Sequence, residues 1–452
     1  MIRRPVDAML RDAAGRRSAH MPGHKGRAPF PCPDLYALDT TELPVTDNLW
    51  KPENAVREAE ERYAAAAGAG CSLFLTGGST AGVHAMLQLY AREGDTVLLP
   101  RNAHLSAVNG CIIGGLDAAW IPARQTPDGM VYTAEADVLS ALDAHPEAKA
   151  LLLTRPDYFG GCIPLTRIAG AARARGIRLL VDEAHGAHLP WMAALPSAGV
   201  FGADAWVQSA HKTLPALTGA AALHLRDPGD RSRALTLLTR EQSSSPSYLL
   251  VRSADDARAW MEMCGRERLA ATAAAVRALR ERLPGMGLAD AHNLWEETGY
   301  AFDPTRLVID APEGGATLEK ALAERGIDIE MADERRAVLI FTAMDTPEEI
   351  AVIGDALALM PHTASLRPPT PRIASLPEKR MTPRAAAMAR TEFVPLTGAE
   401  GRICAAAIGV YPPGIPLFVP GEVLEGEGLR LLKDTAPSRR FGTEGDKIEC
   451  VL

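Results

Sequence analysis

The sequence predicts an α/β protein built around a mostly parallel sheet, and three observations lead to this fold class. Short apolar segments alternate with helical patterns from about residue 53 to residue 225. Turn-forming or polar residues follow the apolar segments, as in strand–helix units. The chain has 452 residues, of which 47% are hydrophobic, so it can bury a large core. Repeated strand–helix–strand units form parallel sheets with right-handed crossovers.

The elements of this predicted sheet follow one another in order. Pro52 and Glu53 suit the first turn of a helix that Gly68 can end. The strand 72–75 leads into the turn TGGST and a helix over residues 80–92, whose apolar residues share one face. Further buried strands are predicted at 96–99, 118–121, 148–153 and 178–181, with helices at 134–144 and 166–175.

The pattern loosens after about residue 290. Strands are predicted at 306–310 and 337–341, and helices at 316–325 and 347–360. The stretch SLRPPTPRIASLPEKRMTP is rich in proline, which is typical of a linker. We therefore expect an N-terminal arm (1–50), a large domain (51–290), a small α/β domain (291–365), a linker (366–383) and a C-terminal domain (384–452).

The composition restricts the expected partners and compartment. Lys and Arg number 48 and Asp and Glu 56, a net charge of −8 without a polybasic run, so neither nucleic acid nor a membrane surface is an expected partner. The seven cysteines are scattered without a CxxC pair, which favours reduced thiols. Neither a signal peptide nor an apolar stretch of about 18 residues occurs. These features predict a soluble, cytoplasmic protein.

The turn TGGST (76–80) lies where a strand meets a helix. Its backbone N–H groups and the hydroxyls of Ser79 and Thr80 could bind a phosphate at the positive end of the helix. It matches neither the Walker loop nor GxGxxG. A plain strand–helix turn is an equally good interpretation of this motif.

Asp182 falls at the carboxyl end of a predicted strand, in RLLVDEAHGAH (178–188). Open α/β sheets bind their ligands at this edge, and a carboxylate there can partner a protonated heterocycle. The alternatives are a helix N-cap and a metal cluster of the carboxylates and imidazoles in this stretch. We expect no metal site, because these groups share one turn and no further ligand motif supports them: Asp182, Glu183, His185 and His188.

Lys212 follows another apolar strand, in AWVQSAHKTLPALTG, together with Ser209 and His211. Burial would lower the pKa of such a lysine and free its amine for Schiff-base chemistry, whereas a surface lysine would have no such role. The order of a phosphate-type turn, a strand-end aspartate and Ser-x-His-Lys is typical of a pyridoxal phosphate site.

Two further residues need an assignment. His104, in RNAHLSA, follows a strand, so its ring could stack on a cofactor or form an ordinary loop hydrogen bond. Lys25, in MPGHKG, is a rival Schiff-base lysine by residue type. The proline and glycines of that motif favour a flexible arm over a packed pocket, so Lys212 is preferred.

With these motifs, the sequence resembles the Orn/Lys/Arg decarboxylase family of fold-type I pyridoxal phosphate enzymes, in its shorter, Bacillus-type branch without a receiver-like domain. The resemblance implies a seven-stranded-type sheet in the large domain and smaller α+β C-terminal domains. The matching stretches keep the family's order along nearly the whole chain: HMPGHKG (20–26), LFLTGGSTAGVHAM (73–86), RNAH (101–104), VDEAHGAH (181–188), SAHKTLPALTG (209–219), SSSPSY (243–248) and YPPGIPLFVPGE (411–422).

The resemblance also implies a role for each matching residue. Lys212 would form the Schiff base with pyridoxal 5'-phosphate, Asp182 would keep the ring nitrogen protonated and His104 would stack on the ring. His185 would lie beside the phenolic oxygen. The phosphate would be bound by the remaining residues of the set: Gly78, Ser79, Thr80, Ser209 and His211.

The implied reaction is the decarboxylation of a basic amino acid, arginine first and lysine or ornithine next, in polyamine biosynthesis. Glu422 would meet the distal cation of the substrate. Ser243 would reach the pocket of a neighbouring subunit, so that a homodimer or a higher homo-oligomer shares its active sites. An aminotransferase or lyase on the same fold remains an alternative, as does a non-catalytic paralogue.

Four positions depart from the family pattern close to the expected pocket. Leu105 replaces a usual lysine, Asp157 and Phe159 stand where threonine and tyrosine are common, and Gly219 replaces a glutamine. The run VRSADDAR (251–258) also departs from the usual MASLD-like sequence. These departures bear on the identity of the substrate more than on cofactor binding.

Overall fold

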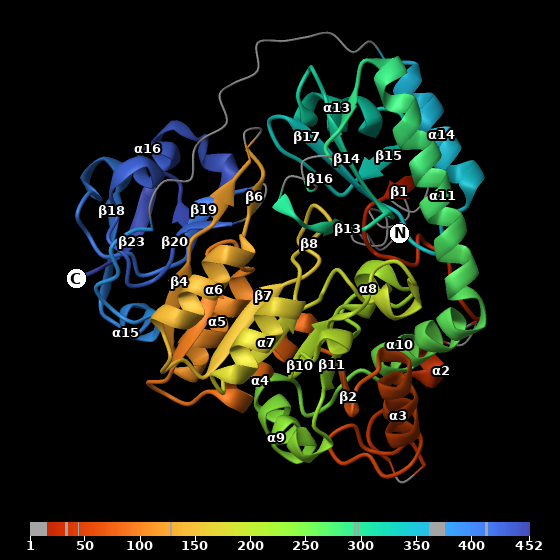
Figure 1. Cartoon of the computed structure of the whole chain (residues 1–452), viewed down its shortest axis with the longest axis horizontal. Helices are drawn as coiled ribbons and strands as arrows, with labels where there is room; N and C mark the ends of the chain where they lie inside the picture. Colours follow the sequence, from red (N-terminus) through yellow and green to blue (C-terminus); the bar gives the residue numbers. More distant parts are fainter. Residues whose placement is uncertain are drawn as a thin grey trace, which may run out of the picture.

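The computed structural model describes residues 16–31, 35–43, 45–126, 129–292, 295, 298–360, 376–411 and 415–452. A seven-stranded sheet of order β2-β11-β10-β9-β7-β3-β4 forms its centre (Figure 1). Only β11 runs antiparallel to its neighbours in this sheet, which confirms the predicted fold class. The strands are β2 (Cys71–Leu75), β3 (Thr96–Pro100), β4 (Asp117–Ile121), β7 (Ala150–Thr154), β9 (Arg178–Asp182), β10 (Ala205–Gln208) and β11 (Ala221–Leu225).

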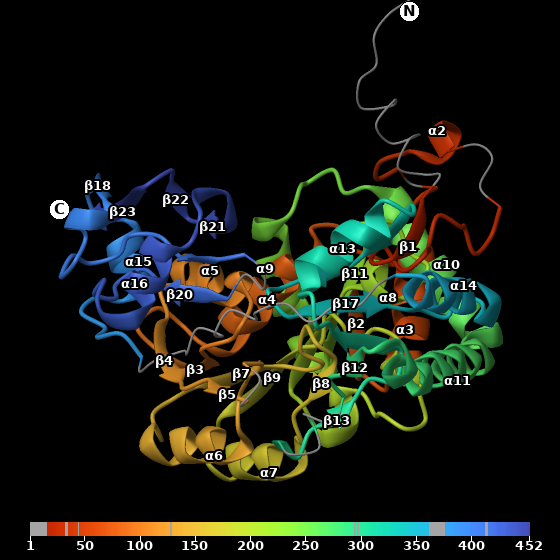
Figure 2. The ribbon, with the colours of Figure 1, turned by 90° about the horizontal axis from the view of Figure 1, so that it is seen from above.

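Helices cover both faces of the sheet (Figure 2). Alternate strand residues face opposite layers: Val97 and Leu99 pack in one apolar cluster and Leu98 in the other. The first cluster contains side chains of α4 (Gly78–Tyr90), α5 (Leu105–Gly114) and α9 (Arg231–Glu241). The second contains side chains of α6 (Glu135–Ala144) and α7 (Thr166–Ala174). The strands are therefore buried on both sides, as their continuous apolar runs indicate.

The helix before β2 begins and ends nearly as predicted. It is α3 (Ala55–Ala67), and Gly68 ends it with a φ of 68°, in the left-handed region. The sequence analysis assigned no element between β11 and residue 290. That segment contains α9, α10 (Tyr248–Trp260), a π-helical turn (Met261–Gly265) and α11 (Arg266–Arg282).

A smaller sheet of order β12-β14-β17-β16 packs beside α11. The predicted strands and helices are present here as β14 (Arg306–Asp310), β17 (Arg336–Ile340), α13 (Gly315–Ala323) and α14 (Pro347–Ala358). Thr346 and Glu349 form a capping box at the start of α14. The other elements are β12 (Ala289–Asp290), β15 (Ile327–Ile329), β16 (Met331–Ala332) and two short pairs, β5 (Arg124–Gln125) with β6 (Val131–Tyr132) and β8 (Gly161–Cys162) with β13 (Ala301–Phe302).

The N-terminal segment is packed, so the expectation of a flexible arm at residues 21–26 is wrong. Strand β1 (Arg17–Ala19) pairs parallel with β15, and the short helix α2 (Leu35–Leu38) follows. Lys25 is buried and donates hydrogen bonds to the carbonyls of His20 (2.7 Å) and Ile340 (2.8 Å). Gly23 lies so close to Leu214 that a Cβ would be 2.6 Å from its carbonyl oxygen. Contacts with residues far away in the sequence hold this segment in place, and no local sequence pattern indicates them. Residues 1–15 of the expected arm lie outside the described residues.

The C-terminal unit contains two three-stranded sheets, β18-β23-β22 and β20-β19-β21. Residues 366–375 of the expected linker lie outside the described residues, but Lys379 is held by Asp117 of β4 at 2.7 Å. The domain boundaries stay a prediction. Within the described ranges, no helix combines the length and apolarity needed to cross a bilayer. The remaining elements are α15 (Pro383–Ala387), β18 (Thr391–Pro395), β19 (Ile408–Val410), β20 (Pro416–Phe418), α16 (Gly426–Asp434), β21 (Arg440–Phe441), β22 (Thr443–Glu444) and β23 (Lys447–Val451).

Candidate active site

The carboxyl ends of four strands bring the candidate residues to one edge of the large sheet. Strands β2, β3, β9 and β10 all run in the same direction, because the antiparallel β11 lies between β2 and β10. The turn TGGST follows β2, His104 follows β3 and Asp182 ends β9. Lys212 lies in α8 (Ala210–Thr213), directly after β10. The sheet therefore assembles these groups at the edge where open α/β sheets bind ligands.

Lys212 is largely enclosed, and its Nζ lies 3.1 Å from His185 Nε2. Burial lowers the pKa of this amine, Asp182 and Glu330 oppose the shift, and Arg306 adds to it. An amine with a lowered pKa is a better nucleophile near neutral pH than an exposed lysine. Lys212 is thus chemically suited to Schiff-base formation.

One carboxylate oxygen of Asp182 accepts a hydrogen bond from the protein, and the other accepts none from the described residues. Its side chain is buried, and Oδ1 accepts a hydrogen bond from the Ala184 amide at 3.1 Å. Within the described part of the chain, no hydrogen bond to Oδ2 is found. The carboxylate acts electrostatically on both Lys212 and His104. It could therefore stabilise a protonated ring nitrogen between them.

His104 is the N-cap of α5. Its Nδ1 accepts a hydrogen bond from the Ser106 amide at 3.2 Å, which fixes one edge of the ring. The residue is exposed to solvent in the single chain. The protein around the ring nevertheless desolvates it enough to lower its pKa, against the opposing charge of Asp182. The structure shows that the His104 side chain forms an N-cap hydrogen bond, and the stacking of its ring on a cofactor stays a prediction.

The turn TGGST joins β2 to α4, and three of its backbone amides already donate hydrogen bonds to protein acceptors, so phosphate binding by this turn stays a prediction. Gly78 has a φ of 68° and opens α4, and its amide donates to the carbonyl of Gly219 at 3.0 Å. Ser79 and Thr80 occupy the first turn of α4. The amides of Thr76 and Gly77 both donate to Gln242 Oε1 at 2.8 Å, a clamp that the sequence did not reveal.

Two hydroxyl groups beside Lys212 have no protein partner. Ser209 Oγ and Thr213 Oγ1 are buried and form no hydrogen bond among the described residues. Such groups are normally satisfied, so these two hydroxyls stand out as polar groups that the described protein residues leave without a partner. His211 is already engaged, since its Nδ1 contacts the Ala220 carbonyl at 3.1 Å. Burial and the neighbouring Lys212 lower the pKa of His211.

His185 connects Lys212 with the small sheet. Its Nδ1 lies 3.4 Å from Nη2 of Arg306, the first residue of β14. The ring of Tyr158 packs edge-on against it, with centroids 5.3 Å apart. Burial, Lys212 and Arg306 hold the pKa of His185 well below its usual value. The ring is therefore neutral at physiological pH.

The structure shows what surrounds three of the four residues that depart from the family pattern. Gly219 has a φ of 99°, which disfavours any side chain at this position. Asp157 Oδ1 accepts hydrogen bonds from the amides of Phe159 (3.0 Å) and Gly161 (2.8 Å), and Phe159 is buried. Leu105 begins α5, but nothing in the structure explains its exchange for the usual lysine.

Asp157→Asn is expected to change how stability depends on pH. Burial raises the pKa of Asp157 to about 7, from 3.8. The folded protein therefore holds this proton more tightly than the unfolded chain, and stability falls as pH rises from about 4 to about 7. Asparagine keeps the Oδ1 acceptor and removes this titration. The free energy of unfolding of the variant relative to wild type should rise over that range by up to about 4 kcal/mol and then level off. Urea unfolding at pH 5 and pH 8 measures it, and a pH-independent difference would contradict the assignment.

Among the described residues, neither of the two expected substrate residues, Glu422 and Ser243, forms a hydrogen bond with Lys212. Both carboxylate oxygens of the buried Glu422 accept hydrogen bonds from Arg101, at 2.9 and 2.8 Å. This pair ties the C-terminal unit to the segment that carries His104. Ser243 is exposed, and its Oγ accepts from the Ser245 amide. The substrate roles of both residues stay predictions.

The residues of the metal alternative have separate partners. Glu183 accepts hydrogen bonds from Ser197 (2.6 Å) and Gln208 (2.7 Å). His188 Nε2 lies 3.1 Å from Asp303. Among the described residues, no three His, Cys, Asp or Glu side chains are grouped as a metal site would require.

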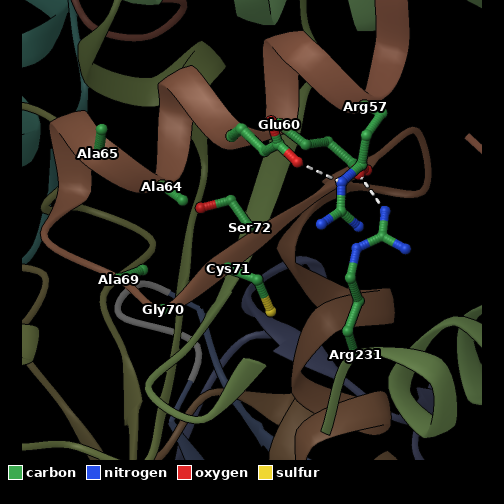
Figure 3. A pocket seen from close by; sticks show the side chains of 10 residues that line it. Arg57, Glu60, Ala64, Ala65, Ala69, Gly70, Cys71, Ser72 and Arg231 are labelled. Carbon is green, nitrogen blue, oxygen red and sulfur yellow. Dashed lines mark hydrogen bonds and ion pairs between the residues drawn. The ribbon is translucent and has the colours of Figure 1, made fainter. Parts of the chain in front are cut away.

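A cavity of about 290 Å³ lies between α3 and β2, apart from the residues around Lys212. Figure 3 shows Arg231 directed toward Glu60 in its wall, where the two form an ion pair. Burial raises the pKa of Glu60 to about 7, against the charge of Arg231. Arg57 pairs with Glu61 beside it. Because the charged side chains of this cavity pair with each other, we assign it no role in the reaction.

The sequence analysis missed three charged or polar residues of this edge. Arg306 and Glu330 come from the small sheet and its connections, and both act electrostatically on Lys212. Gln242 binds the phosphate-type turn from the end of α9. None of these residues stands in a motif that indicates a contact with Lys212, so only the tertiary structure identifies them.

The fold is that of the fold-type I enzymes of the pyridoxal phosphate class, and it brings Lys212 and Asp182 to one edge of the large sheet. Solved structures support the fold. The lysine decarboxylase A of Pseudomonas aeruginosa superposes with a TM-score of 0.77 at 19% identity, covering 92% of this chain and 74% of its own. The lysine decarboxylase of Francisella novicida gives a TM-score of 0.76 at 18% identity, covering 90% and 73%.

Comparison with sequence families identifies the group within that class. The major domain of Orn/Lys/Arg decarboxylases matches residues 15–296, and their C-terminal domain matches residues 370–436. The arginine decarboxylase of Bacillus subtilis is 32% identical over 450 residues, which cover 94% of this chain and 92% of the relative. The arginine decarboxylase of Halalkalibacterium halodurans is 32% identical, with coverage of 92% and 89%. The chain belongs to the Orn/Lys/Arg decarboxylase family. The predicted decarboxylation of a basic amino acid is confirmed at the level of this family.

Proposed function

We propose that this protein converts arginine to agmatine and CO2 with pyridoxal 5'-phosphate, and that lysine and ornithine are the next candidate substrates. The observation that supports it is the position of Lys212, with its lowered pKa, beside Asp182 at the carboxyl edge of the sheet. Arginine comes first because relatives at 30–32% identity are named arginine decarboxylases.

The unpartnered groups of the site fit this cofactor. A phosphate would satisfy the buried hydroxyls of Ser209 and Thr213, and a protonated pyridine nitrogen would satisfy Asp182 Oδ2. A Cβ on Gly78 would meet no atom within 4 Å, so the turn is open on that side. When bound, the cofactor supplies an electron sink for the electron pair left behind when CO2 departs.

The protein groups have distinct tasks in this reaction. Lys212 Nζ is the nucleophile, and burial lowers its pKa, which favours the reactive amine form relative to an exposed lysine. Asp182 holds a proton on the ring nitrogen by charge. His104 is proposed to lie against the ring and His185 beside its phenolic oxygen. The phosphate is proposed to be held by Gly78, Ser79, Thr80, Ser209 and His211.

We propose Glu330 as a further candidate carboxylate for the distal cation of the substrate, because its charge acts on Lys212. It lies between β15 and β16, is only partly buried, and raises the pKa of Lys212 by its charge. Its Oε1 accepts a hydrogen bond from Tyr158 at 2.8 Å, and its Oε2 accepts one from the Met21 amide at 3.0 Å. These donors hold the carboxylate in place near the amine. Glu422 could take this role only if its pair with Arg101 opened.

Glu330→Gln is expected to raise KM for a basic amino acid by about tenfold or more, because an ion pair with the distal cation is lost. The value of kcat should change less, since the distal group does not take part in bond cleavage. Steady-state kinetics with arginine and lysine measure both constants. Glu334→Gln is the matched control, because that carboxylate pairs with Arg439 instead. An unchanged KM in the Glu330 variant would exclude this role.

We also infer a homodimer, or a higher homo-oligomer, with shared active sites. Ser243 is exposed, while the adjacent Gln242 is bound to the phosphate-type turn, so this segment joins the site to the surface. Tyr36 is 91% exposed and Val45 is 89% exposed, as at a surface that a partner covers. A cytoplasmic location and a role in polyamine biosynthesis belong to the same proposal. The cysteines of the described ranges are free thiols, which is compatible with that compartment.

A substrate panel tests the proposed reaction. The purified protein, loaded with pyridoxal 5'-phosphate, is incubated with arginine, lysine and ornithine, and amine and CO2 are measured by mass spectrometry. Agmatine from arginine is the expected result. A keto acid without CO2 would favour an aminotransferase, and no turnover of any of the three would exclude the proposal.

A further inference from the structure

Arg306 is a buried cation next to the active site with donors left unused. Its side chain comes from the first position of β14 and is about 1% exposed. Nη2 lies 3.4 Å from His185 Nδ1, whereas Nε and Nη1 have no hydrogen-bond partner among the described residues. Gly160 closes over the side chain, since a Cβ there would lie 2.9 Å from Arg306 Cβ. The base of the side chain is therefore tightly packed, and the guanidinium contacts the His185 ring through Nη2.

This contact determines which nitrogen of His185 carries the proton. A guanidinium group only donates hydrogen bonds, so Nδ1 of His185 must accept. The neutral ring then has its single N–H at Nε2, which faces Lys212 Nζ at 3.1 Å. An ammonium group at Nζ would place two donors face to face. A neutral amine offers a lone pair and accepts the hydrogen bond.

We propose that Arg306 is a positioning residue, which acts through His185 to keep the Lys212 amine unprotonated and ready for its carbonyl partner. The proposal rests on the proposed function in assigning Lys212 to the cofactor, but it concerns the protein before any cofactor binds. The burial of Nε and Nη1 favours this indirect role over direct contact with a substrate.

The charges around Lys212 oppose one another. Asp182 at the end of β9 and Glu330 after β15 favour the ammonium form, whereas Arg306 and burial favour the amine. Burial has the largest of these effects on the pKa of Lys212, and Arg306 acts in the same direction as burial. Three imidazoles also interact electrostatically with Lys212: His104, His185 and His211.

The test is the reactivity of the Lys212 amine in cofactor-free protein. Acetylation by acetic anhydride is followed over a range of pH, and peptide mass spectrometry gives the extent of modification at each lysine. Arg306→Met should move the midpoint for Lys212 upward by at least about one pH unit, a tenfold loss of labelling at neutral pH. Arg306→Lys restores a cation and a donor, and should recover most of the wild-type profile.

Two controls separate this role from general loosening. Arg336→Met removes another buried arginine of the same sheet, one that is not among the charges acting on Lys212, and should leave the midpoint unchanged. Lys51, whose side chain is 82% exposed, serves as the internal reference. Since no substrate or cofactor is present, the result does not depend on whether the protein decarboxylates arginine.

An unchanged Lys212 midpoint in folded Arg306→Met would overturn the proposal, and so would an equal shift in Arg336→Met. If Arg306→Met does not fold, His185→Phe serves as the second variant, because it removes the imidazole that connects Arg306 with Lys212. That variant must also raise the midpoint, and a wild-type profile would reject the role of Arg306.

Discussion

Lys212→Ala is expected to abolish covalent attachment of pyridoxal 5'-phosphate and to lower decarboxylation by about 10⁴-fold or more, because the charge of Asp182 acts on the Lys212 amine and is not among the charges that act on the rival Lys25. The protein should remain folded, since among the described residues the Lys212 side chain forms a hydrogen bond with His185 alone. The absorbance of the cofactor–lysine linkage and amine release from arginine measure the two effects.

Lys25→Ala is the matched control for this prediction. Lys25 is buried, but its amine is committed to two carbonyl oxygens and lies 3.8 Å from Asp345. Its removal should reduce thermal stability and leave the cofactor linkage intact. If Lys25→Ala abolishes the linkage while Lys212→Ala retains it, the two lysines have been assigned in the wrong order.

Asp182→Asn should lower kcat by about 10²–10³-fold while the protein still binds the cofactor phosphate. The residues proposed to bind the phosphate lie at the starts of α4 and α8, so their positions do not depend on the Asp182 carboxylate. An amide cannot hold a proton on the ring nitrogen by charge, which weakens the electron sink. Single-turnover CO2 release and equilibrium binding of the cofactor measure the two effects separately.

Asp204→Asn provides the corresponding control. Asp204 precedes β10 at the opposite edge of the sheet, where it pairs with Arg178 and Arg226. Its loss should affect stability and leave kcat unchanged. A loss of phosphate affinity in Asp182→Asn equal to its loss of kcat would mean that Asp182 serves the fold rather than the chemistry.

Much of the large sheet and its edge could be predicted from local patterns. Buried parallel strands are continuous apolar runs, and the residue that follows such a run is placed at the ligand-binding edge by topology alone. The positions of Asp182, His104 and Lys212 at the carboxyl edge of the sheet are therefore predictable from the sequence. The turn after β2 is likewise recognisable, because Gly78 supplies the positive φ that it needs.

The rest of the site depends on contacts between distant segments. Arg306 and Glu330 reach Lys212 because the small sheet packs across the edge of the large one, which no local pattern encodes. Lys25 lies in a sequence typical of a flexible turn, yet strand pairing at β1 and its own hydrogen bonds bury it. Composition indicates what a segment prefers locally, and tertiary packing can override that preference.

The C-terminal unit contributes to the site through one buried ion pair. Arg101 precedes His104 by three residues and is held by Glu422 from the other unit, with Leu417 accepting a further hydrogen bond at 2.7 Å. Burial raises the pKa of Glu422, and the charge of Arg101 opposes the shift. The pair gives the PGE turn (420–422) a structural role that does not require a substrate.

The most direct test of the proposed function is to determine which lysine forms the covalent linkage with the cofactor. The protein loaded with pyridoxal 5'-phosphate is reduced with borohydride, digested and mapped by mass spectrometry. We expect the pyridoxyl group on the peptide that contains Lys212, and we expect no pyridoxyl group on that peptide in Lys212→Ala. A pyridoxyl group on Lys25, or no reducible linkage at all, would contradict it.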